Sequence, residues 1–451
     1  MKSKPCENKK LKLRERVLAY VVEHQRHGII LPVVLIVVLA AALVAFSFFE
    51  NREARSGDVQ MKAHSNADDS QVRISFAGDI MLSRNVEKRA NKIGYGKLFA
   101  KMQDLWADSD IVVANLDTCV IEGEAEQYDR LKNKDVFFST HRSNLAYLKE
   151  AGIDVLSLAT DHIADYGRNT IRYAIDELEG LGIKHTGAGE DREKASEYAL
   201  VEIKSGEKTV KVAIFGALGY YAQEYGAKAK RVVDATGRDP NAPMTWEEVQ
   251  AQLQQEANSA SASGDVSVSG DASASGVVIQ DPWYDTAGTF SGGNQLFAEN
   301  INNAREVADI IVVYMHWGDD KMFYESDEMR TLAHKYIDAG ADMVIGSNPR
   351  VVLPVEIYRS NVKPGIIFYS IGSLVYDDAQ SRSCDSVSVD LVLDEKGVLR
   401  AEVTPLRIDG CVPRETENEL YVNRIFAALT KRLDESVYSR SGNKLTINFG
   451  E

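Results

Sequence analysis

The sequence lacks the short motifs that mark the common nucleotide-binding and hydrolase folds. No strand-like run is followed by GxGxxG or GxxxxGK[ST], which disfavours Rossmann and P-loop proteins. A ligase step that consumes ATP would therefore need another protein. No GxSxG turn is present either, which disfavours an α/β-hydrolase.

Cysteine is also scarce, with four residues in 451, and they form neither CxxC nor Cys/His zinc spacing. Cys384 and Cys411 are the pair that we expect to form a disulfide if this part of the chain is extracytoplasmic, because both fall in the C-terminal strand region. Cys119 would then remain unpaired.

Charge is absent from Gly28 to Phe49, a run long enough to span a bilayer as a helix. Eight Lys or Arg and three Glu precede it, a net charge of +5, so the positive-inside rule places the N-terminus in the cytoplasm. A cleaved signal peptide is the alternative, but no small-x-small cleavage site follows the run. We predict a single-pass cell-membrane protein whose main domain is extracytoplasmic.

The full chain carries −15, so the part that follows the anchor carries −20. Such an acidic surface argues against binding to nucleic acid or to anionic lipid. It would attract cations or a basic partner, or it would simply keep the domain soluble. The organisation we expect is a tail (1–27), an anchor (28–49), a stalk (50–70), a main domain (71–412) with a Ser/Ala/Gly loop (254–276), and a C-terminal helix and tail (413–451).

Strand-like runs alternate with amphipathic helical patterns over most of the chain, which indicates an α/β fold with mixed sheets. Several buried-strand patterns stop on a residue that can bind a cation or move a proton. Ligands of such sheets lie beyond the carboxyl ends of the strands. We therefore expect one site assembled from the strand ends at Asp79, Asp117, Asp161 with His162, His316, and Asn348 with Arg350.

At these positions the sequence resembles the CapA family, proteins of capsule and poly-γ-glutamate synthesis. The motifs that carry the resemblance keep the family's order over about residues 72–410: Phe76–Leu82, Asn115–Asp117, Leu158–Gly167, His316–Gly318, Asp338–Gly346 and Tyr369–Ser373. The resemblance implies a metallophosphoesterase-like fold with α/β/β/α layers and a site for divalent metal ions.

This chain departs from the family's motifs at several positions. It has Asp161 where the family has Asn, Asp117 where it has Glu, and Ser373 where it has Asn. The family's Gly-x-His-Pro-His segment is replaced by one that carries Asn348 and Arg350, so both of its histidines are gone. These replacements imply a remodelled site.

The resemblance assigns a role to each of these residues. Asp79 would face one metal, Asp117 would bridge, Asp161, His316 and Asn348 would face the other, and His162 would be a general acid. Arg350 and Ser373 would bind substrate or compensate charge. Because guanidinium cannot ligate a metal, we expect Arg350 to replace one ion and to pair with Asp79 and Asp117. The site then holds at most one divalent ion, Mn²⁺, Mg²⁺ or Ca²⁺.

Structural roles compete with some of these assignments, since Asp79 and Asp165 could cap the helices that follow them. Three functions stay open. The chain is an anchored protein that assists synthesis or export of an anionic polymer such as poly-γ-glutamate, with membrane synthetase or export subunits as partners. Alternatively, it is an active metal-dependent phosphoesterase or amide-bond hydrolase. The third reading is a non-catalytic module that binds polyanions.

Overall fold

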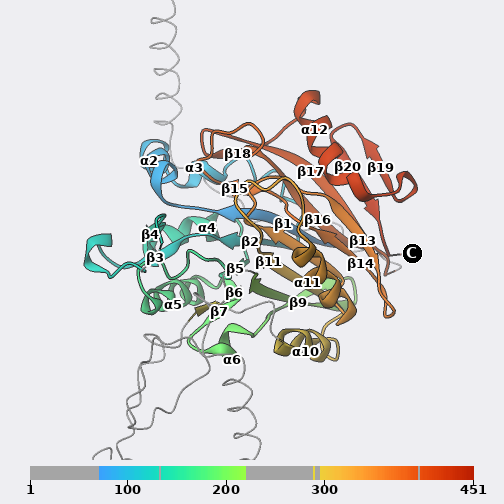
Figure 1. The fold of residues 1–451 in the computed structure, drawn as a ribbon, viewed down its shortest axis with the longest axis horizontal. Helices are drawn as coiled ribbons and strands as arrows, with labels where there is room; N and C mark the ends of the chain where they lie inside the picture. The colour runs from blue at the N-terminus through green and yellow to red at the C-terminus, as the bar shows by residue number, and fades with distance from the viewer. Residues whose placement is uncertain (1–70, 132–133, 220–287, 290–294, 395–396, 451) are drawn as a thin grey trace, which may run out of the picture. The chain divides into compact units, whose positions relative to one another are not determined.

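A computed structural model describes residues 71–131, 134–219, 288–289, 295–394 and 397–450 (Figure 1). They belong to one compact unit, Val59–Glu451. In this described part of the chain, no helix is both long and apolar enough to cross a membrane. The predicted tail, anchor, stalk and Ser/Ala/Gly loop lie outside the described residues, and the domain boundaries stay a prediction.

The larger sheet is parallel toward one edge. Strands β1, β2, β5 and β6 run parallel, and β15 pairs with the end of β1. The rest of the sheet is antiparallel and ends in a C-terminal hairpin. Its strands are β1 (Val72–Ile80), β2 (Ile111–Leu116), β5 (Val155–Ser157), β6 (Lys184–Thr186), β15 (Ser373–Val375), β16 (Asp385–Leu393), β17 (Leu399–Asp409), β18 (Val412–Glu415), β19 (Tyr438–Ser441) and β20 (Lys444–Asn448).

The second sheet has parallel strands flanked by an antiparallel strand on each side, in the order β13-β14-β12-β11-β9-β8. Its strands are β8 (Ala199–Ser205), β9 (Lys208–Leu218), β11 (Ile310–His316), β12 (Met343–Ser347), β13 (Val355–Arg359) and β14 (Pro364–Phe368). Two short pairs lie outside the large sheets: β3 (Cys119–Ile121) with β4 (Ser139–His141), and β7 (Ala188–Gly189) with β10 (Gly288–Thr289).

The inner faces of the two large sheets pack against each other. Ile74 and Phe76 of β1 and Val312 of β11 belong to one fully buried apolar cluster. The hydroxyl of Tyr314 in β11 donates to the carbonyl of Ala77 in β1 at 2.7 Å, which fixes the two sheets across this core. The parallel strands read as continuous apolar runs because both of their faces are covered.

Helices cover the outer faces of the sheets, so the protein is a layered mixed α/β fold (Figure 1). Apolar side chains of α2, α3, α4 and α5 pack on β1, β2 and β5, and those of α10 and α11 pack on β9 and β11. Helix α12 joins the inner cluster instead. The bounds are α2 (Arg84–Ile93), α3 (Gly96–Phe99), α4 (Ala146–Glu150), α5 (Ile171–Leu181), α6 (Arg192–Ala195), α10 (Gln295–Ala304), α11 (Asp327–Asp338) and α12 (Glu419–Leu429).

Local sequence explains the helix ends. Ser326 caps α11 by accepting the backbone N–H of Met329, and Asn418 caps α12 in the same way through Leu420. Helix α5 ends at Gly182, whose φ of 68° lies in the left-handed region that glycine adopts without strain.

Neither Asp79 nor Asp165 is the helix cap that the sequence allowed. Asp79 lies inside β1, and Ser83 precedes the next helix. Asp165 is followed by a 3₁₀ turn whose N-cap is Gly167, and its own carboxylate accepts hydrogen bonds from a lysine, a histidine and a backbone N–H instead. Both carboxylates are therefore available to a site.

The expected disulfide is not formed, because Cys119, Cys384 and Cys411 are all free thiols. Cys384 Sγ donates to the carbonyl of Asp378 at 3.3 Å, and Cys119 Sγ lies 3.1 Å from the hydroxyl of Thr170. Packing and weak hydrogen bonds therefore satisfy these thiols within the fold.

Candidate metal centre

The carboxyl ends of parallel strands from both sheets meet in one buried cluster. Asn115 of β2 donates its side-chain N–H to Asp79 Oδ1 at 2.8 Å, and the same nitrogen lies 3.2 Å from His316 Nδ1. His316 Nδ1 is also 3.4 Å from Asp79. Since β1 and β11 belong to different sheets, only the packing of one sheet on the other brings these side chains together.

Asp117, Asp161 and His316 form a triad whose ligand atoms all lie within 4.8 Å of one another. His316 Nε2 is 3.8 Å from Asp117 Oδ1 and 3.3 Å from Asp161 Oδ1. The other Asp117 oxygen is buried and has no hydrogen-bond partner among the described residues. A buried carboxylate oxygen without a donor is unfavourable unless a cation completes it. Two carboxylates and one imidazole therefore fit a single divalent ion.

The charges of the triad depend strongly on one another. Burial opposes the charge on Asp161, but the charge of His162 and a hydrogen bond from His316 outweigh it and hold the Asp161 pKa well below its usual range. Burial raises the pKa of Asp117. Burial disfavours the His316 cation, yet its bonds to Asp161 and Asp79 raise the pKa to about 10. A divalent ion would displace that proton, because a ligating imidazole is neutral.

His162 lies beside the triad and is oriented by a buried carboxylate. Its Nδ1 is 2.8 Å from Asp165 Oδ2, and its Nε2 is 3.7 Å from Asp161. Because Nδ1 faces Asp165, the second ring nitrogen is the one that faces the triad. The ring stacks on Phe138 with centroids 3.8 Å apart. This arrangement suits the general-acid role that the resemblance implies.

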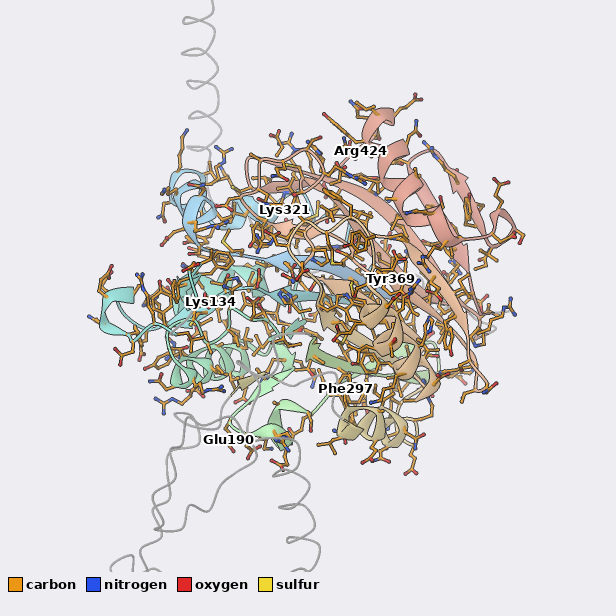
Figure 2. All side chains as sticks on the ribbon, viewed as in Figure 1. Lys134, Glu190, Phe297, Lys321, Tyr369 and Arg424 are labelled. Carbon is orange, nitrogen blue, oxygen red and sulfur yellow. The ribbon has the colours of Figure 1, made fainter. Side chains whose placement is uncertain are left out.

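Lys134 is a member of the site that the sequence analysis missed. Its ammonium group lies 2.7 Å from Asp165, 3.2 Å from Asp161 Oδ2 and 2.6 Å from the Asp161 carbonyl. The side chain, labelled in Figure 2, is only 9% exposed. It follows no strand and sits at the end of a polar loop, so no sequence pattern marks it.

Asn348 and Ser373 contact the site differently from their predicted roles. Asn348 donates its backbone N–H to Asp79 Oδ2 at 3.0 Å, while its side-chain N–H₂ donates to the carbonyl of Gly318 at 2.5 Å. Its backbone, rather than its side chain, therefore contacts a site carboxylate. Ser373 pairs with Asp79 through the β1–β15 ladder, which places its buried hydroxyl on the neighbouring strand.

Arg350 does not make the predicted ion pairs with Asp79 and Asp117. Its nearest carboxylate is Asp320, 3.5 Å from Nε, and its guanidinium lies over the Tyr376 ring at 4.3 Å. Within the described residues His316, not Arg350, is the cation between the site carboxylates. Tyr376 was not expected, although it lies just beyond the Tyr369–Ser373 motif.

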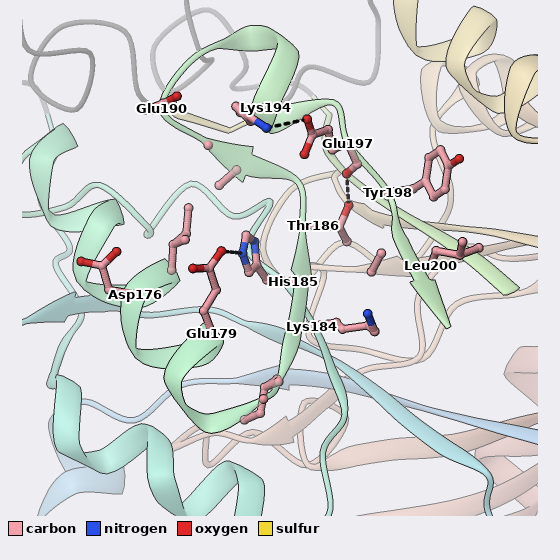
Figure 3. Close-up of a pocket in the computed structure, with 16 residues that line it drawn as sticks. Asp176, Glu179, Lys184, His185, Thr186, Glu190, Lys194, Glu197, Tyr198 and Leu200 are labelled. Carbon is pink, nitrogen blue, oxygen red and sulfur yellow. Dashed lines mark hydrogen bonds and ion pairs between the residues drawn. The ribbon is translucent and has the colours of Figure 1, made fainter. Parts of the chain in front are cut away.

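A separate pocket of about 670 Å³ is lined by residues of α5, β6, β7, α6 and β8 (Figure 3). Its charged groups pair with one another, as in His185 with Glu179 and Lys194 with Glu197. None of the predicted site residues lines this pocket. The metal centre is therefore a compact buried cluster that is separate from this pocket.

Residues 73–378 match the bacterial capsule synthesis protein family PGA_cap. The matched segment runs from β1 to just beyond β15, so it includes every residue of the candidate metal centre. It covers more than half of the chain. The chain belongs to this family. The predicted resemblance to capsule and poly-γ-glutamate synthesis proteins is thus confirmed.

Proteins similar to this chain have names that agree with this assignment. The chain is 25% identical to a capsule biosynthesis protein CapA of Bacillus anthracis over 97% of this chain and 91% of that protein. It is 27% identical to a PGA biosynthesis protein CapA of Bacillus subtilis over 80% and 79% of the two chains. A probable polyglutamine synthesis accessory protein of Mycobacterium tuberculosis is 27% identical over 60% and 56%.

Solved structures give only distant matches to this PGA_cap member. A Thermus thermophilus protein aligns over 73% of this chain and 97% of its own, with 8% identity and a TM-score of 0.32. An anchor protein of the Plasmodium inner membrane complex aligns over 80% and 95%, with 13% identity and a TM-score of 0.33.

Proposed function

We propose that this protein is an anchored, extracytoplasmic accessory protein that assists synthesis or export of a capsular anionic polymer such as poly-γ-glutamate. Membership of the capsule synthesis family carries this proposal. The names of the Bacillus relatives, a capsule biosynthesis protein and a PGA biosynthesis protein, support it. The uncharged run at residues 28–49, with basic residues before it, supports the anchor and its orientation.

We further propose that Asp117, Asp161 and His316 hold one divalent ion, and that Asp79 and Asn115 contact His316 at its other ring nitrogen. When bound, this ion would supply Lewis-acid polarisation of a substrate oxygen. Asp161 is held by Lys134 on its outer side, and His316 is held by Asp79 and Asn115. These contacts orient the ligands before any ion arrives, which reduces the cost of binding it.

A metal-dependent hydrolase is the second candidate function, and the His162–Asp165 contact of 2.8 Å favours it. Asp165 keeps His162 in one orientation, and Phe138 keeps the ring plane fixed. In that orientation Nε2 can hold a proton for a leaving oxygen or nitrogen next to the triad. A phosphoester or an amide bond is the bond class that such a site would cleave.

Deletion of the gene tests the accessory role, with polymer on the cell surface as the readout. We expect polymer to be lost and to return when the wild-type gene is supplied. His334→Ala is the matched control, because His334 pairs with Glu356 away from the site and should restore polymer fully. Unchanged polymer in the deletion strain would reject the accessory role.

Two variants then separate the candidate functions. His316→Ala removes a metal ligand, and His162→Ala removes the proposed acid. If His162→Ala restores polymer while His316→Ala does not, the metal is structural and the hydrolase candidate fails. If neither variant restores polymer, and purified wild type cleaves a phosphodiester with Mn²⁺ while His162→Ala does not, the hydrolase candidate stands.

A further inference from the structure

Five buried side-chain atoms around the Asp79–Asp117 pair have no hydrogen-bond partner among the described residues. Two of them can only accept, and one of these two belongs to the proposed metal ligand Asp117. The others can donate. The acceptors are Asn115 Oδ1 and Asp117 Oδ2, and the donors are Arg350 Nε, Ser373 Oγ and Tyr376 Oη. Buried donors without partners are uncommon in folded proteins, and each calls for an explanation such as a bound ligand, ion or water.

Arg350 is a permanent cation held beside the site without a hydrogen bond at Nε. Its side chain is 12% exposed, and Asp320, its nearest carboxylate, lies at 3.5 Å. The charge of Asp117 also acts on it. Its backbone has φ of 55°, a left-handed conformation that is strained for any residue other than glycine. Such strained residues concentrate where a ligand binds.

Tyr376 supplies a hydroxyl that stays protonated. It is 1% exposed, and burial together with the charge of Asp117 raises its pKa well above the usual value for tyrosine. Its ring packs edge-on against Phe138, which in turn stacks on His162. One wall of packed rings therefore runs from the proposed acid, His162, to the guanidinium of Arg350.

Ser373 reaches the same region from β15. Its Cα pairs with that of Asp79 in the parallel ladder, and the residue is fully buried. Gly78 and Gly372 make this pairing close, because a Cβ on Gly78 would lie 2.0 Å from the Gly372 carbonyl. The hydroxyl is thus held rigidly on the strand next to the metal centre.

We propose that Arg350, Tyr376 and Ser373 form an oxyanion-binding subsite beside the Asp117–Asp161–His316 triad. A permanent cation and two hydroxyls match an oxyanion, since each oxygen of such a group accepts several hydrogen bonds. The ligand is a carboxylate or phosphoryl group of the substrate. This inference rests on the proposed function. It adds that the substrate carries such a group close to the part of the substrate that lies at the metal.

Packing alone is the competing explanation for Arg350 and Tyr376. A guanidinium over an aromatic ring is favourable without any ligand. That explanation leaves the Tyr376 and Ser373 hydroxyls buried and unsatisfied, which the ligand resolves. Tyr376→Phe separates the two explanations, because it keeps the ring and the contact with Arg350 and removes only the hydroxyl.

Titration calorimetry on the purified full-length protein tests the subsite, with inorganic phosphate and a short γ-linked glutamate oligomer as separate probes. Hydrogen bonds to a charged group contribute about 1.5–3 kcal/mol, so Tyr376→Phe and Ser373→Ala should each weaken Kd roughly 10- to 150-fold. Arg350→Gln should weaken binding of the probe by at least the same factor. Tyr336→Phe, in helix α11, is the matched control and should bind like wild type.

Binding of either probe with this pattern supports the subsite, and the tighter probe identifies the phosphoryl or the carboxylate ligand. Wild type that binds neither probe, or Tyr376→Phe and Ser373→Ala variants that bind as wild type does, would overturn it. Far-ultraviolet circular dichroism confirms that each variant is folded. Metal content and polymer restoration are measured separately, so the subsite and the proposed function can fail independently.

Discussion

The ammonium group of Lys134 lies 2.7 Å from a carboxylate oxygen of Asp165, whose side chain is fully buried, while that of Lys134 is 9% exposed. The same carboxylate accepts the backbone N–H of Phe138 and holds His162. This ion pair thus fixes the loop that precedes β4 and the His162 ring beside the triad. Through its contact with the Asp161 carbonyl, Lys134 also fixes the chain after β5.

Lys134→Met is expected to destabilise the protein by about 3–5 kcal/mol, because it leaves Asp165 charged, buried and without its cation. Urea denaturation measures this loss. The double variant Lys134→Met with Asp165→Asn should lose less than the two single variants together, because they share one interaction. Lys194→Ala, in an exposed pair with Glu197, is the control and should leave the midpoint unchanged. Additive losses in the double variant would show that the pair is not coupled.

Metal analysis of purified protein is expected to find one divalent ion per chain. His316→Ala and Asp161→Ala each remove a ligand and should weaken binding by more than the roughly 10- to 100-fold that loss of an outer contact costs. His334→Ala should retain the ion, since His334 lies outside the triad. Two stoichiometric ions per wild-type chain would contradict a site of one metal.

Gly78→Ala is expected to cost at least about 1–3 kcal/mol, the usual range for overpacking a core. The new Cβ would meet the Gly372 carbonyl at 2.0 Å and would push β1 away from β15. Gly180→Ala is the matched control, since a Cβ there meets nothing within 4 Å in the interior of α5. It should stabilise the protein by about 0.5–1 kcal/mol. Thermal denaturation of both variants shows whether each substitution lowers or raises the stability.

Stability should fall at alkaline pH through Cys119. Burial raises its pKa from an ordinary value near 9 to about 12. The folded state holds the thiol proton more tightly than the unfolded state does, which adds to the free energy of unfolding. This contribution is complete below pH 9 and is lost as the pH rises through 12. The difference in free energy of unfolding between wild type and Cys119→Ala should therefore shrink between pH 9 and 11. A constant difference over that range would show that the thiol titrates normally.

Much of the fold followed from local pattern. The apolar run of residues 111–116 coincides with β2, and two strand-like runs around Ser205-Gly206 coincide with β8 and β9, because buried parallel strands and tight turns have strong signals. The C-terminal hairpin of β19 and β20 was missed. Its residues are mostly exposed and alternate weakly, so pairing with β17 decides their conformation.

The sequence alone determined the family, the strand ends and the residue types of the triad. Asp117, Asp161 and His316 each follow or end an apolar run, and that order is written in the chain. Only the tertiary structure decided which of these groups touch. His316 meets Asp79 because two sheets pack face to face, Lys134 reaches Asp165 across a loop, and Arg350 turns to Tyr376 instead of the carboxylates. Contacts between distant segments depend on packing geometry, and no local pattern encodes them.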